Sequence, residues 1–117
     1  HPDLLDHPDH KLAKKILPKG AGSIIAFGVK GGRVAGEAFI NAVKLASNLA
    51  NVGDSKTLVI HPASTTHSQM DSETMQLAGL TEDMIRFSVG IEDIEDIISD
   101  FDNGFRAAKK PLLAANQ

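Results

Sequence analysis

The sequence predicts a small α+β domain with two layers, in which about four strands form a mostly antiparallel sheet and helices cover one of its faces. Three observations predict this fold class. The 117 residues are enough for one domain. Short runs rich in β-branched residues interleave with segments whose apolar residues recur every three or four positions. The segments between them differ in length, and no internal repeat is visible.

The first half of the chain contains a loop, two helices and a strand between them. Residues 1–8 carry two prolines and two aspartates and read as a loop. Residues 9–17 place four apolar side chains on one helical face. Residues 23–30 form an apolar strand, in which Gly28 suggests a bulge or a close backbone approach. The helix expected over residues 33–45 has an apolar stripe made largely of alanine, so it should pack closely against the sheet.

The second half begins with two short strands. We expect one over residues 47–50 and a compact β-branched one over residues 57–60, which His61-Pro62 ends. A polar segment follows, and then a short helix that ends at Gly79. Polar and apolar residues alternate over residues 84–89, which predicts a strand with one face buried.

The last element is a long amphipathic helix with acidic residues in its first turn and Arg106, Lys109 and Lys110 in its last, as the helix dipole favours. Gly104 inside it costs about 1 kcal/mol relative to alanine. From Pro111 onward we expect a frayed tail. The apolar stripe consists of Ile91, Ile94, Ile97, Ile98, Phe101, Phe105 and Ala108. We expect a solvated face formed by Glu92, Asp93, Glu95, Asp96, Asp100 and Asp102.

Composition excludes several classes of function. The net charge of −3 and the absence of a basic stripe argue against binding of nucleic acid or anionic lipid. No apolar run approaches the roughly 20 residues of a membrane helix. There is no cysteine, which fits a reducing cytosol, and there is no tyrosine or tryptophan to stack on a ring-bearing ligand. The opening at His1, with no signal-peptide pattern after it, reads as a cut inside a longer protein.

Histidines and glycines do not form a recognisable catalytic or nucleotide site. His7 and His10 read as surface or loop residues, and no third ligand accompanies them. His61 and His67 bracket a polar loop, where a structural role is favoured over metal binding. The glycines do not match a dinucleotide-binding fingerprint or a phosphate-binding loop, so positions in turns and bulges explain them better.

Arg86 is the strongest candidate for a binding residue. It lies in the middle of a strand, between Ile85 and Phe87, in a segment that otherwise reads as core. A guanidinium there needs an anionic partner. Either Arg86 pairs with a carboxylate of its own domain, or it faces a cleft and binds the carboxylate of a ligand with its planar fork of donors.

Residues 61–67 (HPASTTH) and 85–93 (IRFSVGIED) closely resemble the C-terminal part of the Cys/Met-metabolism family of pyridoxal-phosphate enzymes. Residues 17–23 (LPKGAGS), 27–32 (FGVKGG) and 49–54 (LANVGD) are most similar to its O-acetylhomoserine sulfhydrylase branch. The resemblance covers nearly the whole chain. It implies that residues 1–117 are the small C-terminal domain of a fold-type I enzyme, whose large cofactor-binding domain lies outside this chain.

The resemblance also implies roles for individual residues. Arg86 falls on the family's arginine that binds the α-carboxylate of the substrate, and Asn51 falls where many relatives carry a serine that contacts the same carboxylate. Thr66 falls on a threonine near the active site that helps to orient groups of the cofactor domain. The lysine and aspartate that hold pyridoxal phosphate belong to the other domain, so we expect no catalytic residue, cofactor or metal on this chain and no activity from it alone.

For the whole enzyme, the resemblance implies a cytoplasmic homotetramer that makes homocysteine from O-acetylhomoserine and sulfide in methionine biosynthesis. Two alternatives stay open on the sequence. One is another reaction of the same family, that of a cystathionine γ-synthase or a methionine or cystathionine γ-lyase. The other is a binding or assembly module with no catalytic partner.

Overall fold

The computed structural model describes residues 1–115. Four strands, four α-helices and one short 3₁₀ helix make up the described part. In chain order they are α1 (His10–Ile16), β1 (Ile24–Gly28), α2 (Gly32–Ala42), β2 (Ser47–Asn48), β3 (Leu58–Ile60), η1 (Pro62–Ser64), α3 (Ser72–Leu77), β4 (Met84–Ser88) and α4 (Ile94–Ala115).

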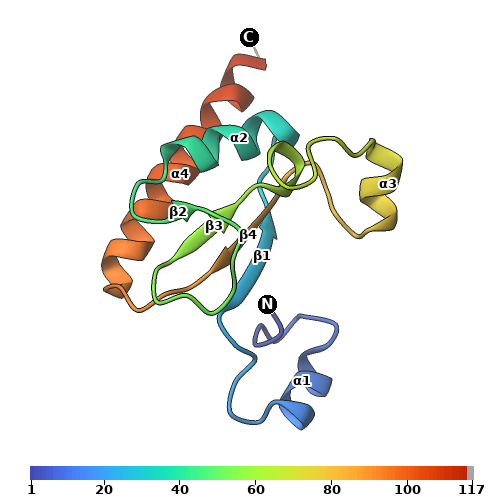
Figure 1. Ribbon diagram of the computed structural model, residues 1–117, viewed down its shortest axis with the longest axis vertical. Helices are drawn as coiled ribbons and strands as arrows, with labels where there is room; N and C mark the ends of the chain where they lie inside the picture. The colour runs from blue at the N-terminus through green and yellow to red at the C-terminus, as the bar shows by residue number, and fades with distance from the viewer. Residues whose placement is uncertain (116–117) are drawn as a thin grey trace.

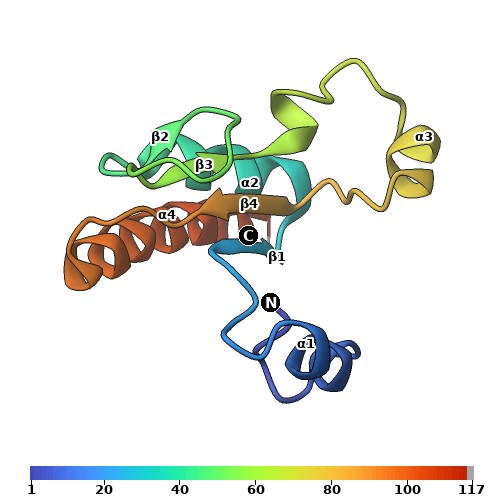
Figure 2. The same cartoon turned by 60° about the horizontal axis from the view of Figure 1, so that its bottom comes forward.

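The four strands form one sheet in the order β1-β4-β3-β2. β4 pairs antiparallel with both β1 and β3, whereas β2 pairs parallel with β3. α2 and α4 lie side by side on one face of the sheet, and α1 and α3 project away from it (Figures 1 and 2). The predicted fold class, a two-layer α+β domain with a mostly antiparallel sheet and helices on one face, is confirmed.

The core between the sheet and the two long helices is built on phenylalanine. All five phenylalanines of the chain lie in contact there. Phe39 of α2 is fully buried and stacks on Phe101 of α4, with ring centroids 5.6 Å apart. A Cβ on Gly104 would lie 2.7 Å from the Phe39 ring. The glycine inside α4 therefore has a packing reason, because it lets the two helices approach across this ring.

The prediction that the chain frays from Pro111 onward is wrong for residues 111–115, and the rest of the predicted tail lies outside the described residues. α4 continues through Pro111 to Ala115, so Arg106, Lys109 and Lys110 lie before its last turn. Leu112 supplies the physical reason. Its side chain packs so close to Gly31, at the start of α2, that a Cβ there would lie 3.1 Å from it. This tertiary contact extends the helix beyond a residue that cannot donate a backbone hydrogen bond.

The prediction of a solvated acidic face is wrong for Asp100. Its side chain is only 7% exposed, and its carboxylate accepts hydrogen bonds from the backbone N–H groups of Lys44, Leu45 and Ala46 at 2.6, 3.0 and 2.9 Å. These groups belong to the connection between α2 and β2, where regular structure leaves them without a partner. The carboxylate satisfies all three, and this bond set ties α4 to the connection.

Two further details differ from the sequence prediction. Ile91 lies before α4 and is exposed, and Ile94, Ile98 and Phe105 are exposed as well. The buried residues of the predicted stripe are Ile97, Phe101 and Ala108. α1 forms where it was expected, but only Ala13 is buried, and the apolar side chains of Leu12 and Ile16 are exposed. No helix in residues 1–115 is both long and apolar enough to cross a membrane.

Candidate functional site

Arg86 lies at the centre of the sheet, on the face that α2 and α4 leave open. β4 is flanked by β1 and β3, and the Cα partners of Arg86 are Ala26 and Ile60. Side chains alternate between the two faces of a strand. Because Ile85 and Phe87 pack into the core, the guanidinium of Arg86 belongs to the opposite face.

The guanidinium keeps most of its donors free. Nη2 donates to the backbone oxygen of Asn51 at 3.3 Å, and Nε is buried without a hydrogen-bond partner. None of the ion pairs within residues 1–115 involves Arg86. A buried donor without an acceptor destabilises a fold. A carboxylate that used Nε and one terminal nitrogen together would satisfy it, since this is the edge of the fork that binds carboxylates in two parallel bonds.

Asn51 lies beside Arg86, as its predicted role requires. It belongs to the exposed loop between β2 and β3. Its side-chain oxygen accepts a hydrogen bond from the backbone N–H of Val52 at 2.8 Å. The contact to Arg86 runs through the backbone oxygen of Asn51, whereas the prediction concerned its side chain. The side-chain NH₂ can still donate to an anion bound at the guanidinium.

A network of buried and half-buried groups holds this loop against the end of β4. The carboxylate of Glu92 accepts hydrogen bonds from the backbone N–H and the hydroxyl of Thr57, both at 2.7 Å. The Thr57 hydroxyl in turn accepts from the N–H of Gly90 at 2.9 Å. The backbone N–H of Thr57 is the main cause that lowers the pKa of Glu92 below its ordinary value. The sequence reading assigned Glu92 to a solvated face and missed this role.

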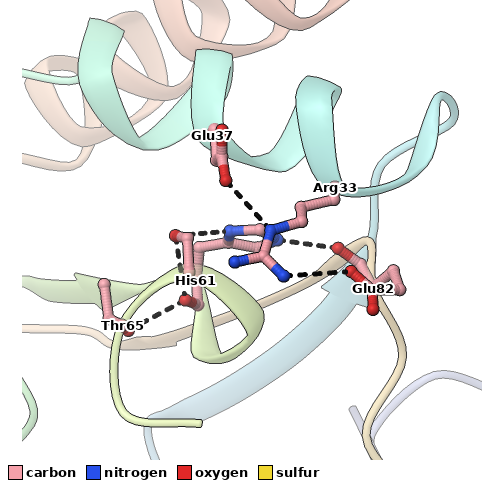
Figure 3. A network of polar contacts seen from close by, with 6 residues as sticks. Arg33, Glu37, His61, Thr65 and Glu82 are labelled. Carbon is pink, nitrogen blue, oxygen red and sulfur yellow. Dashed lines mark hydrogen bonds and ion pairs between the residues drawn. The ribbon is translucent and has the colours of Figure 1, made fainter. Parts of the chain in front are cut away.

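Thr66 lies apart from the other two predicted residues. It is exposed, and its hydroxyl is hydrogen-bonded to Nδ1 of the neighbouring His67 at 2.8 Å. No hydrogen bond in the described residues joins it to Arg86 or Asn51. The structure thus brings Arg86 and Asn51 together and places Thr66 in a separate loop after η1, at the end of β3. Before that loop, His61 is hydrogen-bonded to the hydroxyl groups of Ser64 and Thr65, and the second of these bonds is visible in Figure 3.

The residues of this chain do not by themselves fit pyridoxal phosphate. A lysine that reacts with the cofactor needs an enclosed, partly dry surrounding, and every lysine here is exposed. There is also no tyrosine or tryptophan to stack on the pyridine ring. Metal binding has no more support, because no three histidine, aspartate or glutamate side chains converge within the described part of the chain.

Comparison with known proteins gives consistent matches. The sequence profile of the Cys/Met metabolism PLP-dependent enzymes matches residues 1–106. A homocysteine synthase of Schizosaccharomyces pombe is 54% identical over 92% of this chain, and an O-acetyl-L-homoserine sulfhydrylase of Corynebacterium glutamicum is 50% identical over 89%. The chain spans about a quarter of the length of these relatives, 25% and 24% respectively, and the matched part is their C-terminal quarter.

Solved structures agree with the sequence matches. A Campylobacter jejuni protein described as an O-acetylhomoserine (thiol)-lyase is 38% identical, with a TM-score of 0.82 over 91% of this chain and 25% of its own. Its structure carries pyridoxyl-lysine monophosphate at its position 205. A cystathionine gamma synthase of Xanthomonas oryzae pv. oryzae, solved with aminoacrylate and cysteine, is 34% identical, with a TM-score of 0.82 over 94% of this chain and 28% of its own.

Proposed function

Because this chain belongs to the Cys/Met metabolism family of pyridoxal-phosphate-dependent enzymes, we propose that it is the substrate-carboxylate-binding domain of an enzyme that makes homocysteine from O-acetylhomoserine and sulfide. The observation that carries the proposal is the guanidinium of Arg86, which stands on the open face of the sheet with its buried Nε unpaired. The names of the relatives supply the substrate, since they include O-acetyl-L-homoserine sulfhydrylases.

Arg86 binds the α-carboxylate of the amino-acid substrate in this proposal. A rigid central strand carries the guanidinium, so a bidentate contact fixes both the position and the plane of the carboxylate. Fixing that group also fixes the direction of the remaining bonds at Cα, which decides which of them can react. The side-chain NH₂ of Asn51 donates a further hydrogen bond to the same carboxylate, and Thr66 orients groups of the rest of the protein.

The remaining parts of the enzyme lie outside this chain in the proposal. Pyridoxal phosphate and the residues that react belong to the large domain of the longer protein, of which residues 1–117 are the C-terminal domain. Two observations support this. The chain covers a quarter of its relatives, and its own lysines are all exposed. We further propose, on the family resemblance, that the whole enzyme is a cytoplasmic homotetramer.

A chimeric enzyme tests the proposal. This chain would replace the matching C-terminal quarter of the S. pombe homocysteine synthase, and homocysteine formation from O-acetylhomoserine and sulfide would be measured. We expect an active chimera and no activity from the 117-residue chain mixed with the same reagents and pyridoxal phosphate. Arg86→Ala in the chimera should lower kcat/KM at least about a hundredfold, because it removes a charge-assisted bidentate contact.

Two results would contradict the proposal. Homocysteine from the isolated chain would show that the chemistry does not need another domain. A folded Arg86→Ala chimera with unchanged kcat/KM would remove Arg86 from the site. Offering cysteine in place of sulfide to the full-length protein separates the sulfhydrylase from a cystathionine γ-synthase, since the second enzyme uses cysteine as its nucleophile. A folded chimera that stays inactive with either nucleophile would favour a non-catalytic module.

A further inference from the structure

His61 links the two segments that carry Thr66 and Arg86, although it belongs to neither the substrate-binding pair nor the core between the sheet and helices. It directly follows β3, whose last residue, Ile60, is the Cα partner of Arg86. Its side chain is 0% exposed. The backbone ladder between β3 and β4 ends at this point, so the next contact between the two segments depends on the imidazole.

Both ring nitrogens of His61 are used. Nε2 is 2.8 Å from the backbone oxygen of Glu82, in the segment that leads into β4. Nδ1 is 2.7 Å from the hydroxyl oxygen of Ser64, in the segment that leads to Thr66. A carbonyl oxygen can only accept, so Nε2 donates to Glu82; in the tautomer that carries its hydrogen at Nε2, Nδ1 accepts from the Ser64 hydroxyl, whose oxygen also lies 3.4 Å from the backbone oxygen of His61. The hydroxyl of Thr65 adds a bond to the backbone oxygen of His61 at 2.8 Å (Figure 3).

Helix α2 holds the ring in this position. The imidazole lies directly against Gly36, where a Cβ would come within 2.6 Å of its Cδ2 atom. Arg33, one turn earlier in α2, pairs with Glu37 at 3.1 Å and reaches Glu82 at 3.9 Å (Figure 3). The ring is therefore confined between the helix, the start of β4 and the turn of η1, and it cannot rotate without breaking both of its hydrogen bonds.

We propose that His61 is a positioning residue for the carboxylate site, which sets the entry of β4 and hence the place of the Arg86 guanidinium. The inference rests on the proposed function. His61 acts through the Glu82 carbonyl four residues before Arg86, and it touches no substrate. The same ring also fixes the start of the loop that bears Thr66. One side chain therefore holds the segments of Thr66 and Arg86 in fixed positions relative to each other.

Two substitutions test the hydrogen bonds of the two ring nitrogens separately. The amide of His61→Gln reaches the place of Nε2 and can still donate to Glu82, whereas the shorter amide of His61→Asn reaches only the place of Nδ1 and Ser64. In the chimeric enzyme we expect His61→Asn to raise KM for O-acetylhomoserine about tenfold, with kcat changed less than about threefold, because small displacements of a binding group carry large costs. His61→Gln should stay within about threefold of the parent in both values.

Two controls exclude a merely structural effect. KM for sulfide, which has no carboxylate, should not change in His61→Asn. In an Arg86→Lys background, where the planar fork is already lost, His61→Asn should raise KM for O-acetylhomoserine less than about threefold, because the two residues act through one contact. An equal tenfold rise in both backgrounds, or an equal loss in His61→Asn and His61→Gln, would overturn the proposal.

Ser64→Ala keeps the test decisive if His61→Asn does not fold. It removes the hydroxyl at Nδ1 and leaves the ring with its bond from Nε2 to Glu82 in place, so we expect KM for O-acetylhomoserine to stay within about threefold of the parent, as in His61→Gln. A tenfold rise of KM in Ser64→Ala would overturn the proposal that His61 acts through Glu82. Failure of the proposed function has a different signature, because then the parent chimera is inactive or Arg86→Lys leaves KM unchanged.

Discussion

The two faces of β4 differ in how their side chains are satisfied: one packs into the hydrophobic core, and the other carries the guanidinium of Arg86. Ile85 is 0% exposed and lies in a core that is closed by α2 and α4. Arg86, the next residue, lies on the other face, and its buried Nε has no hydrogen-bond acceptor in the described part of the chain. The core face is closed by helices of this chain. On the face with Arg86 the neighbouring side chains of Leu58, Ile60 and Ser88 are also buried, and the guanidinium is the group that keeps a buried donor without an acceptor in residues 1–115. The difference teaches that packing explains both faces of β4 except for this one side chain, whose donors a ligand would satisfy in the proposed function.

The largest expected effect breaks the core face. Phe39→Ala should lower the free energy of unfolding by about 3–5 kcal/mol, because it removes a fully buried ring that stacks on Phe101 and leaves a cavity. Denaturant unfolding of the 117-residue chain measures it. Leu77→Ala, at a largely exposed position, is the control and should stay within about 0.5 kcal/mol of the parent. A loss below about 1 kcal/mol for Phe39→Ala would refute the central place of this ring.

The core face was also the part that the sequence predicted best. The apolar spacing of the last helix and the alternation over residues 84–89 depend on burial alone, and both elements formed, although α4 begins after Ile91 and continues past Pro111. The predictions for Asp100 and Pro111 were wrong because distant residues determine their surroundings. The carboxylate of Asp100 binds three backbone N–H groups more than 50 positions away. The helix continues through Pro111 because Leu112 contacts Gly31. The parallel pairing of β2 likewise depends on a contact that no local pattern encodes.

Prediction of the site divides in the same way. The strand position of Arg86 left an internal ion pair and a ligand site both open on physical grounds, with the ion pair favoured, and only the resemblance indicated the ligand site. Its neighbour Asn51 followed from the same motifs. The sequence favoured a structural role for His61 over metal binding, but it did not identify the partners of His61 or those of Glu92, because each joins segments that are brought together by the fold and not by spacing.

A smaller effect concerns how the loop with Asn51 is attached to the open face. The hydrogen-bond network that holds this loop depends on the ionised carboxylate of Glu92. The pKa of Glu92 in the folded chain lies below the ordinary value of 4.5. A lowered folded pKa stabilises the fold above the unfolded pKa, and this contribution is lost as pH falls through the folded pKa. Glu92→Gln should therefore cost less than about 1 kcal/mol at pH 7, since the group is only half-buried and solvent screens its interactions.

The pH dependence of that difference is the specific test. The gap in unfolding free energy between the parent and Glu92→Gln should shrink as the solution is acidified below the ordinary pKa of 4.5. Asp3 and Asp71 also have lowered pKa values, through Lys14 and the N–H of Thr74 respectively, and they act in the same direction in both proteins. Subtracting the two curves removes their contribution. A gap that stays constant from pH 7 to pH 3 would show that the carboxylate charge does not hold the loop.

The smallest expected effect is the most discriminating, because it sets two adjacent residues of one strand against each other. Arg86→Ala should change the unfolding free energy of the 117-residue chain by no more than about 0.5 kcal/mol, since its one hydrogen bond is long and its buried Nε gains nothing from folding. Ile85→Ala, one position earlier and facing the core, should cost about 2–5 kcal/mol. If Arg86→Ala destabilised the chain as much as Ile85→Ala, the arginine would be part of the packing, and the open face would no longer need a ligand to explain it.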